Sequence, residues 1–274
     1  PRQVLRRRPE RAAERGLLPQ IGSELEFFLF REDYASARAK NWRGLVHGHH
    51  YVEDYHVLSG AFVEPVIGAI RRGVDASGIP VEFSKGEWGP GQHEINLRYA
   101  PALEMADRHV VYKLAAKEIA AAHGFSLTFM AKFQEDLAGS SLHLHLSLAS
   151  PAGDPVFPGD GGLAGAPRRS PLGPRHLLPV VLAHARELAL CFAPNPNSYK
   201  RYRRGTFAPT GIAWSYDNRT AGFRVVGRGP SLRVECRIPG ADANPYLAIA
   251  ALLAAGLAGL EARREPGPAF RGDV

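Results

Sequence analysis

The chain has 274 residues, of which 45% are hydrophobic and 22% charged, and its net charge is +7. Such a composition is typical of a soluble globular protein that can bury a sizeable core. Two cysteines are too few for a disulfide framework, and the longest apolar run, residues 246–260, is shorter than the roughly 18 to 20 residues that a membrane span needs. With no signal peptide visible, we predict a cytoplasmic protein that does not associate with membranes.

The positive charge is concentrated at the start of the chain, where six arginines lie between residues 2 and 15. Glu10 and Glu14 interleave with these arginines, and the pattern favours a solvated helix face. The sequence has no basic-aromatic module typical of nucleic-acid recognition. We therefore expect no nucleic-acid partner; the alternative, a basic nucleic-acid binder, would show strongly salt-dependent retention on DNA.

The predicted elements alternate between strands and helices. Apolar runs predict strands at residues 22–30, 81–83, 94–99, 126–132, 141–148, 222–226 and 231–238. Helical periodicity predicts helices at residues 59–76, 107–123 and 177–192, and a last one from about residue 245. Residues 150–174 hold six glycines and six prolines, which indicates a long surface loop within one domain. Helices interspersed with antiparallel strands predict an α+β fold.

Pairs of polar residues spaced by two lie on three of these strands. In an extended strand, both members of such a pair point to the same face. The pairs are Glu24 with Glu26, His143 with His145, and Arg233 with Glu235, the last continued by Arg237. Two more carboxylates, Glu87 and Glu94, lie between the first two pairs.

These carboxylates predict a divalent metal site. Buried carboxylates must be paired or must coordinate metal, and a set of oxygens with one histidine suits Mg²⁺ or Mn²⁺ better than Zn²⁺. Arg233, Glu235 and Arg237 leave two interpretations open. They can form a cross-strand ladder of ion pairs, or the arginines can hold phosphate while Glu235 holds metal.

Eight short segments carry a further signal because of their order. They are residues 22–30 (GSELEFFLF), 89–95 (GPGQHEI), 128–132 (TFMAK), 142–147 (LHLHLS), 197–201 (NSYKR), 217–219 (DNR), 233–237 (RVECR) and 244–248 (NPYLA). This ordered set, which covers nearly the whole chain, resembles the catalytic domain of the glutamine synthetase family. The resemblance implies a curved antiparallel sheet flanked by helices.

The resemblance also implies two divalent metals per site, either Mg²⁺ or Mn²⁺. One metal would lie on Glu26, Glu87 and Glu94. The other would lie on Glu24, His143 and Glu235.

Substrate contacts are implied in the same way. ATP would contact His145, Ser147 and Arg233. The residues implied to hold the glutamate carboxylate or the transferring phosphoryl group are Arg201, Arg219, Arg224 and Arg237, of which Arg219 and Arg237 are the implied catalytic residues. Gly139, in the loop before His143, is also expected to contact the substrate.

The activity implied is an ATP-dependent ligation. The γ-carboxylate of glutamate would be phosphorylated to γ-glutamyl phosphate, and ammonia or an amine would then displace the phosphate. Such phosphoryl transfer depends on positioning and charge neutralisation, which metals and arginines supply.

Phe207 departs from the family members that make glutamine, which carry a glutamate at this place to bind and deprotonate ammonium. Phenylalanine cannot accept a proton, but its ring can pack on an alkylamine. In this respect the chain resembles the γ-glutamylpolyamine synthetase-like, or glutamate–amine ligase, branch. We therefore predict that an amine or polyamine is favoured over ammonia.

The resemblance places the whole of residues 1–274 in one catalytic domain. Family members carry an N-terminal β-grasp domain and C-terminal helices, which we expect to lie outside this chain, and full-length relatives form homo-oligomers of the dodecamer type. The alternative from another class is a catalytically silent fragment that acts as a nucleotide-binding, metal-binding or assembly module.

Overall fold

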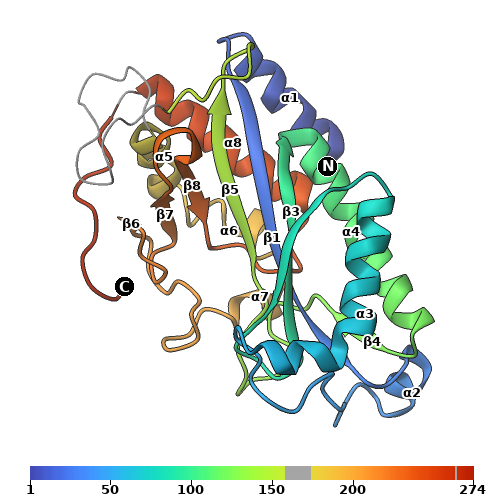
Figure 1. Ribbon diagram of the computed structural model, residues 1–274. Helices are drawn as coiled ribbons and strands as arrows, with labels where there is room; N and C mark the ends of the chain where they lie inside the picture. Colours follow the sequence, from blue (N-terminus) through green and yellow to red (C-terminus); the bar gives the residue numbers. More distant parts are fainter. Residues whose placement is uncertain (158–173, 263) are drawn as a thin grey trace.

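A β-sheet runs through the molecule and carries the polar pairs (Figure 1). The computed structural model describes residues 1–157, 174–262 and 264–274. Over these residues the strand order is β2-β3-β1-β5-β8-β7-β6, and β4 pairs with the end of β1. The strands are β1 (Leu18–Phe30), β2 (Val81–Gly86), β3 (Gln92–Pro101), β4 (Ser126–Thr128), β5 (Leu142–Ala149), β6 (Trp214–Tyr216), β7 (Phe223–Val226) and β8 (Arg233–Cys236).

The described strand pairs are antiparallel with one exception. At the edge of the sheet β6 runs parallel to β7. The predicted α+β fold is confirmed, and the expected antiparallel sheet is corrected at this edge to a mixed sheet. Strand β6 ends at Tyr216, and residues 217–222 carry the chain back to the level where β6 began. Strand β7 therefore starts beside Trp214 and runs in the same direction as β6.

Helices flank the sheet, as predicted. They are α1 (Arg2–Ala13), α2 (Tyr34–Ala39), α3 (Val57–Ala76), α4 (Ala102–Ala122), α5 (Leu178–Ala183), α6 (Ala189–Phe192), α7 (Pro196–Tyr199) and α8 (Pro245–Ala262). Two short 3₁₀ turns are at Pro174–Leu177 and Gly229–Ser231. Helices α1, α4 and α8 pack together on one face of the sheet, where α4 lies against β1, β3 and β4 (Figure 1).

The central strand β1 separates the core from the polar face. Leu25 and Phe27 are fully buried in the hydrophobic core on the side of α4. Glu24 and Glu26 alternate with them and therefore point to the opposite face of the sheet. The period of two in the sequence thus places both carboxylates on the face that the three packed helices leave open.

Several predicted elements differ in extent: α4 and β1 begin earlier than expected, at Ala102 and Leu18, and β8 is shorter than residues 231–238. A predicted helix that is broken and a predicted strand that ends early have identifiable local causes. The helix expected at residues 177–192 is broken into α5 and α6. Between these two helices, the amides of Ala185 and Ala189 bond to carbonyls three residues back, at 3.5 and 3.1 Å, as in a 3₁₀ turn. The strand expected at residues 126–132 ends at Thr128, whose hydroxyl accepts a hydrogen bond from the Met130 amide at 3.2 Å and turns the chain out of the sheet.

Three short elements were not predicted: helices α2 and α7 and strand β6. Helix α2 has six residues and depends on Asp33, whose carboxylate accepts a hydrogen bond from the Ser36 amide at 2.7 Å. Strand β6 has three residues, too few for a period to be visible. Most of the predicted glycine- and proline-rich loop, residues 158–173, lies outside the described residues.

The two terminal helices carry the basic and the apolar segments noted in the sequence. Helix α1 buries Leu5 and Ala12 and pairs Arg2 with Asp107 at 2.8 Å, so its arginines line the outer face of a packed helix. Helix α8 is long and apolar enough to cross a membrane by length and composition alone. However, 67% of it is buried inside the protein, as in an ordinary core helix.

Candidate active site

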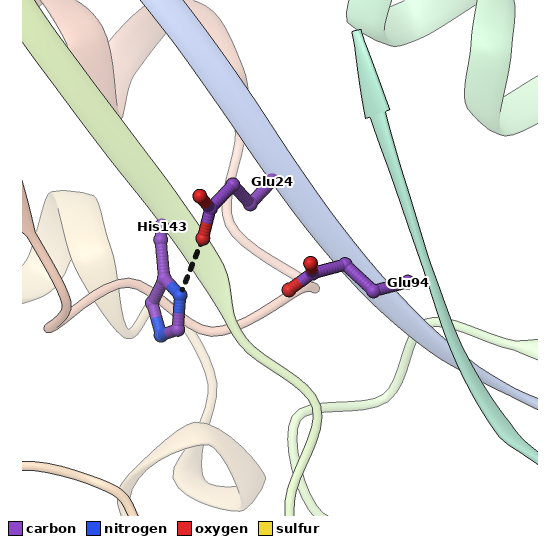
Figure 2. Close-up of side chains that lie close together, drawn as sticks. All are labelled: Glu24, Glu94 and His143. Atoms are coloured by element: carbon purple, nitrogen blue, oxygen red, sulfur yellow. Dashed lines mark hydrogen bonds and ion pairs between the residues drawn. The ribbon is translucent and has the colours of Figure 1, made fainter. Parts of the chain in front are cut away.

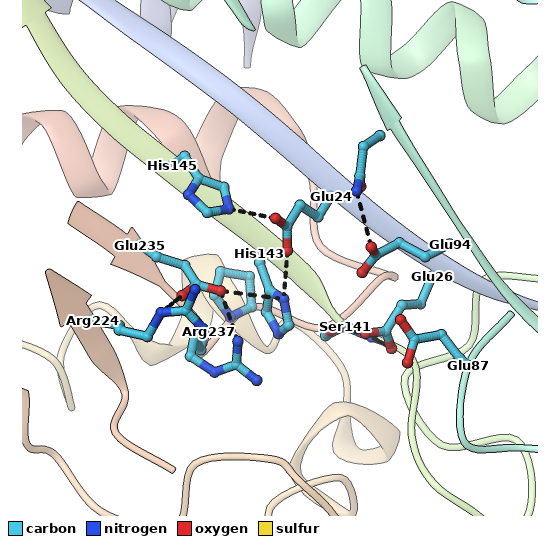
Figure 3. A network of polar contacts seen from close by, with 12 residues as sticks. Glu24, Glu26, Glu87, Glu94, Ser141, His143, His145, Arg224, Glu235 and Arg237 are labelled. Atoms are coloured by element: carbon cyan, nitrogen blue, oxygen red, sulfur yellow. Dashed lines mark hydrogen bonds and ion pairs between the residues drawn. The ribbon is translucent and has the colours of Figure 1, made fainter. Parts of the chain in front are cut away.

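Cross-strand register brings the polar residues together. On β1, Glu26 lies opposite Glu94 of β3, and Glu24 lies opposite His143 of β5. Further across the sheet, His145 of β5 lies opposite Glu235 of β8. Figure 3 shows these side chains converging on one face of the sheet. The sequence predicted that each pair shares a face, and the register adds that the pairs are neighbours.

Three carboxylates form the first cluster. Ligand oxygens of Glu26, Glu87 and Glu94 lie within 4.8 Å of one another, which matches the first metal set expected from the sequence. Glu26 and Glu94 are buried, and Glu87 is nearly so. The Lys85 ammonium forms an ion pair with Glu87 and lies 3.7 Å from Glu94. Among the described residues, Lys85 is the one whose positive charge directly contacts these carboxylates.

The electrostatics of this cluster favour a cation. Burial, followed by repulsion from neighbouring carboxylates, raises the pKa of Glu26, Glu87 and Glu94 to about 7 each. A divalent ion would relieve both effects, and three carboxylates supply the hard oxygen ligands that Mg²⁺ and Mn²⁺ prefer. The residues present therefore fit such a metal.

Two neighbours that sequence analysis missed hold Glu26 in place. The Ser141 amide donates to Glu26 Oε2 at 2.8 Å and its hydroxyl donates to Oε1 at 2.6 Å. The Gln92 side-chain amide donates to Glu26 Oε2 at 3.2 Å and to the Gly139 carbonyl at 3.0 Å. Gln92 lies two residues before Glu94, and Ser141 lies two residues before His143. This proximity in the sequence could have indicated that both residues belong to the site.

Glu24 and two histidines form the second cluster (Figure 3), and Figure 2 shows Glu24 with one of them, His143, beside Glu94. His143 Nδ1 lies 3.1 Å from Glu24 Oε2, and His145 Nε2 lies 2.7 Å from Glu24 Oε1. Burial alone would raise the pKa of Glu24, but these hydrogen bonds outweigh it and hold the pKa below its usual value. Burial lowers the pKa of His143 to about 4, so its imidazole is neutral and able to ligate a metal.

The expected second metal set, Glu24, His143 and Glu235, is connected through the imidazole of His143. Its Nδ1 atom lies 3.6 Å from Glu235 Oε1 as well as 3.1 Å from Glu24. Two overlapping groups have ligand atoms within 4.8 Å of one another: Glu24 with Glu94 and His143, and Glu24 with His145 and Glu235. Glu24 therefore belongs to both of these groups.

Glu235 is also held by two arginines. Arg237 Nη1 donates to Glu235 Oε1 at 2.7 Å, and Arg224 Nε lies 2.9 Å from Oε2. Burial raises the pKa of Glu235, but these charges and the histidines outweigh it, so that the net pKa is lowered. The ladder that the sequence left open is therefore present only in part: Arg237 pairs with Glu235, and the cross-strand partner is Arg224 of β7, whereas Arg233 bonds to His145. The other interpretation, phosphate on the arginines and metal on Glu235, stays a prediction.

Two cavities meet at this polar face. The first has a volume of about 560 Å³ and is lined by the first cluster, by Glu24 and His143 of the second, and by four arginines: Arg201, Arg219, Arg224 and Arg237. The second, of about 610 Å³, contains the three residues expected to contact ATP: His145, Ser147 and Arg233. Glu24 lines both cavities and so lies where they join.

Within the second cavity, Arg233 Nε donates to His145 Nδ1 at 3.0 Å. That bond fixes the imidazole ring, whose other nitrogen bonds to Glu24. Leu18, Leu148 and Phe157 add apolar surface to the wall. An elongated anionic ligand with one apolar end would match this arrangement of charge and surface.

The expected substrate residues differ in how they are held. Arg201 is buried and donates from Nη2 to the carbonyls of Arg237 at 3.1 Å and Pro239 at 3.0 Å. Gly139 approaches Arg201 so closely that a Cβ atom would lie 2.5 Å from its side chain. Arg219 is exposed at the cavity wall. All three line the first cavity, as does Phe207.

Several further lining residues were not predicted, among them Asp54, Tyr55, Lys85 and Trp88. Lys85 and Trp88 flank Glu87 in the sequence, but Asp54 and Tyr55 come from the segment before α3, which had no motif. The Asp54 amide bonds to the Glu87 carbonyl at 3.1 Å, and this contact brings that segment to the site.

Comparison with known proteins agrees with this geometry. The family described as "Glutamine synthetase, catalytic domain" matches residues 1–274. The chain is 50% identical over 278 residues to the gamma-glutamylethanolamide synthetase GlnA4 of Streptomyces coelicolor, covering 100% of this chain and 58% of that protein. It is 40% identical over 269 residues to the glutamate–isopropylamine ligase of a Pseudomonas species, covering 97% and 57%.

A solved structure gives the same result. The GmaS/ADP complex aligns with a TM-score of 0.86 at 33% identity, over 99% of this chain and 61% of that one. The chain thus spans less than two thirds of the length of these relatives. Over the part that is compared, both the sequence and the fold match. The chain belongs to the glutamine synthetase family and corresponds to its catalytic domain.

Proposed function

We propose that this chain provides the active site of an ATP-dependent ligase that joins the γ-carboxylate of glutamate to an amine. The observation that carries this proposal is Glu24, at the junction between a cavity rich in arginines and carboxylates and a second cavity with a partly apolar wall. Two substrates bound in these cavities would meet at that residue. Phosphoryl transfer between them needs positioning and charge neutralisation, which is what the surrounding groups offer.

The proposed assignment of residues is the one that the family resemblance implies, and the distances around Glu87 and His143 support it. Glu26, Glu87 and Glu94 would hold one Mg²⁺ or Mn²⁺ ion, and Glu24, His143 and Glu235 the other. Such ions neutralise charge on the transferring phosphoryl group. His145, Ser147 and Arg233 would contact the nucleotide in the second cavity.

The arginines of the first cavity would bind the acceptor. Arg201 and Arg224 are buried, and their charge would favour the glutamate carboxylates. Arg219 and Arg237 would approach the γ-phosphoryl group as it moves from ATP to the γ-carboxylate oxygen, with ADP as the leaving group. Fixed positive groups at this place stabilise the charge on the equatorial oxygens. The amine nitrogen would then attack the carbonyl carbon of γ-glutamyl phosphate, releasing phosphate and a proton.

The acceptor is proposed to be an amine in preference to ammonia. Phe207 presents a half-exposed ring to the first cavity and cannot accept a proton. Relatives named for ethanolamide synthesis and for isopropylamine ligation support this choice. Both of these names refer to small monoamines, so within the predicted class of amines and polyamines we favour a small monoamine.

The wider setting is part of the same proposal. We propose that residues 1–274 form one catalytic domain, that the active protein is a cytoplasmic homo-oligomer, and that further domains of the kind found in longer relatives contribute to activity. A catalytically silent binding module remains the second candidate.

The experiment that tests the proposal is ADP release by the intact protein with Mg²⁺, ATP and glutamate, with ammonium compared against a panel of mono-, di- and polyamines. Amine-stimulated turnover with formation of a γ-glutamyl amide is expected. Metal-dependent ATP binding without turnover, in a protein whose folding is verified, would support the silent module instead.

A further inference from the structure

Two aromatic side chains meet at the wall of the first cavity. Trp88 follows Glu87 in the loop after β2, and Phe207 lies between α7 and β6. Their ring centroids are 5.4 Å apart with an interplanar angle of 67°, an edge-to-face contact. Trp88 is 51% exposed and Phe207 is 59% exposed, so neither ring is used to fill the core. Large apolar surfaces left open in a cavity of charged groups indicate a place for a ligand.

The backbone holds both rings where they are. The Gln92 amide donates to the Gly89 carbonyl at 2.9 Å, and the Gly89 amide donates to Gln92 Oε1 at 3.0 Å, which closes the loop that carries Trp88. On the other side, Phe207 has a φ of 60°, in the left-handed region that aromatic residues rarely adopt. The preceding Thr206 hydroxyl donates to the Arg203 carbonyl at 2.7 Å and closes that turn. Strain of this kind persists where the surroundings fix it, and it is common at ligand sites.

The charges around these rings favour an organic cation. Lys85 Nζ lies 5.2 Å from the centre of the Tyr55 ring, so that aromatic face already has a cation. Over the part of the chain that the structure describes, no lysine or arginine lies over the ring of Trp88 or Phe207. Such faces attract alkylammonium groups, tryptophan most strongly.

Asp54, an acidic side chain at the wall of the first cavity, limits the length and charge of the ligand. Among the described lining residues, Asp54 is the carboxylate that belongs to neither proposed metal set. It is exposed and joined through its amide to Glu87, so it can attract a single ammonium group toward Trp88. A second ammonium at the far end of a diamine would find aromatic neighbours but no further free carboxylate among these residues.

We propose that Trp88, together with Phe207, forms the subsite for the acceptor amine, and that Trp88 determines a preference for primary alkylamines with a short uncharged chain. This inference rests on the proposed ligase function. Trp88 would pack on the carbon chain and on the ammonium before its deprotonation, and the nitrogen would face the γ-carboxylate beside Glu87. The residue acts on the choice of amine and on its position, and takes no part in proton transfer.

The test compares Trp88→Leu and Trp88→Phe with the unaltered intact protein. Propylamine, 1,3-diaminopropane and ammonium serve as acceptors, so that the first two share one chain length and differ in terminal charge. In Trp88→Leu, the ratio of kcat/KM for propylamine to that for ammonium should fall about tenfold, mostly through KM for the amine. Trp88→Phe should retain most of the ratio. Trp42→Leu is the matched control, because Trp42 is 56% exposed and lines neither cavity.

A binding measurement separates this inference from the proposed function. The protein has three tryptophans, and propylamine added with ADP, glutamate and Mg²⁺ should shift the tryptophan emission of the unaltered protein but not that of Trp88→Phe. An unaltered protein without amine-stimulated turnover would overturn the ligase. Turnover with an unchanged propylamine-to-ammonium ratio in Trp88→Leu would overturn the role of Trp88 alone, and a faster reaction with 1,3-diaminopropane than with propylamine would overturn the preference for an uncharged chain.

Discussion

Arg224 Nε lies 2.9 Å from Glu235 Oε2 in a pair that is almost fully enclosed, with the side chains 8% and 1% exposed. Arg237 holds the other oxygen of the same carboxylate at 2.7 Å. A buried carboxylate between two guanidinium groups is costly to disturb, because removing it leaves two buried positive charges without their partner. Glu235 therefore has a structural role in addition to its proposed role as a metal ligand.

Glu235→Gln should lower the free energy of unfolding of the metal-free protein by about 3 to 5 kcal/mol. Urea denaturation in the presence of a chelator measures this directly. Glu135→Gln is the control, because it removes an exposed carboxylate that also pairs with an arginine, Arg203 at 2.6 Å, and its effect should be close to zero. Equal effects in the two variants would show that the Glu235 pairs contribute nothing beyond a surface ion pair.

Lys85→Met should strengthen binding of divalent metal to the first carboxylate cluster. The Lys85 ammonium pairs with Glu87 and lies 3.7 Å from Glu94, so it competes for the same oxygens as a metal ion. Removing the charge should lower the dissociation constant for Mn²⁺ about tenfold, as measured by calorimetry. Lys40→Met alters the net charge equally but disrupts a pair with Glu32 outside the cavities. Weaker Mn²⁺ binding in Lys85→Met than in Lys40→Met would contradict competition.

Metal binding should depend steeply on pH. The folded metal-free protein retains protons on Glu26, Glu87 and Glu94 up to a pKa of about 7, whereas the unfolded chain releases them near 4.5. These carboxyls therefore stabilise the metal-free fold on the acid side, and this contribution is lost as the pH rises through 7. Because metal needs the ionised form, Mn²⁺ affinity should rise by about tenfold per pH unit for each proton released below pH 7, then level off.

Two buried histidines have the opposite effect on how the stability of the fold depends on pH. Burial lowers the pKa of His93 and His109 to about 3 each, so their contribution to stability is present above pH 6.5 and is lost as the pH falls toward 3. The quantity to measure is therefore the difference in melting temperature with and without Mn²⁺, from which the effect of these two histidines largely cancels. A difference that stays constant between pH 5.5 and 8 would exclude carboxyls of raised pKa as the ligands.

Phe207→Glu should shift the acceptor preference of the intact protein toward ammonium. The substitution places a carboxylate at the cavity wall, where it attracts a small cation and can accept its proton. The ratio of kcat/KM for ammonium to that for propylamine should rise about tenfold. Phe207→Leu, which removes the ring but adds no base, should raise the ratio less, and only through a higher KM for propylamine. If both variants respond alike, the loss of the ring and not the gain of a base explains the change.

Much of the fold could be predicted from the sequence, because its longer elements have clear periods. Strands β1 and β5 and helices α3, α4 and α8 appear where apolar spacing indicated them. The pairing of Glu24 with Glu26, and of His143 with His145, on single faces also follows from a period of two. Some elements of three to six residues, such as β6 and α2, contained too little pattern to be predicted.

The site could be predicted less completely, because its geometry depends on register and on loops. Nothing in the spacing of His143 and Glu24 says that they lie opposite one another. Trp88 and Phe207 meet across 119 positions of sequence through two loops that lack periodicity, so their contact had no local signal. Lys85 was visible beside Glu87, but only the hairpin of β2 and β3 brings it to Glu94.

The central claim is that ATP phosphorylates the γ-carboxylate of glutamate before the amine reacts. The most direct test supplies the intact protein with glutamate labelled with ¹⁸O in its γ-carboxylate, together with ATP, Mg²⁺ and propylamine. The account predicts a γ-glutamyl amide and inorganic phosphate that carries one ¹⁸O atom from the carboxylate. Amide formed together with unlabelled phosphate would contradict the acyl-phosphate route, and labelled glutamate recovered without amide or ADP would contradict the ligase itself.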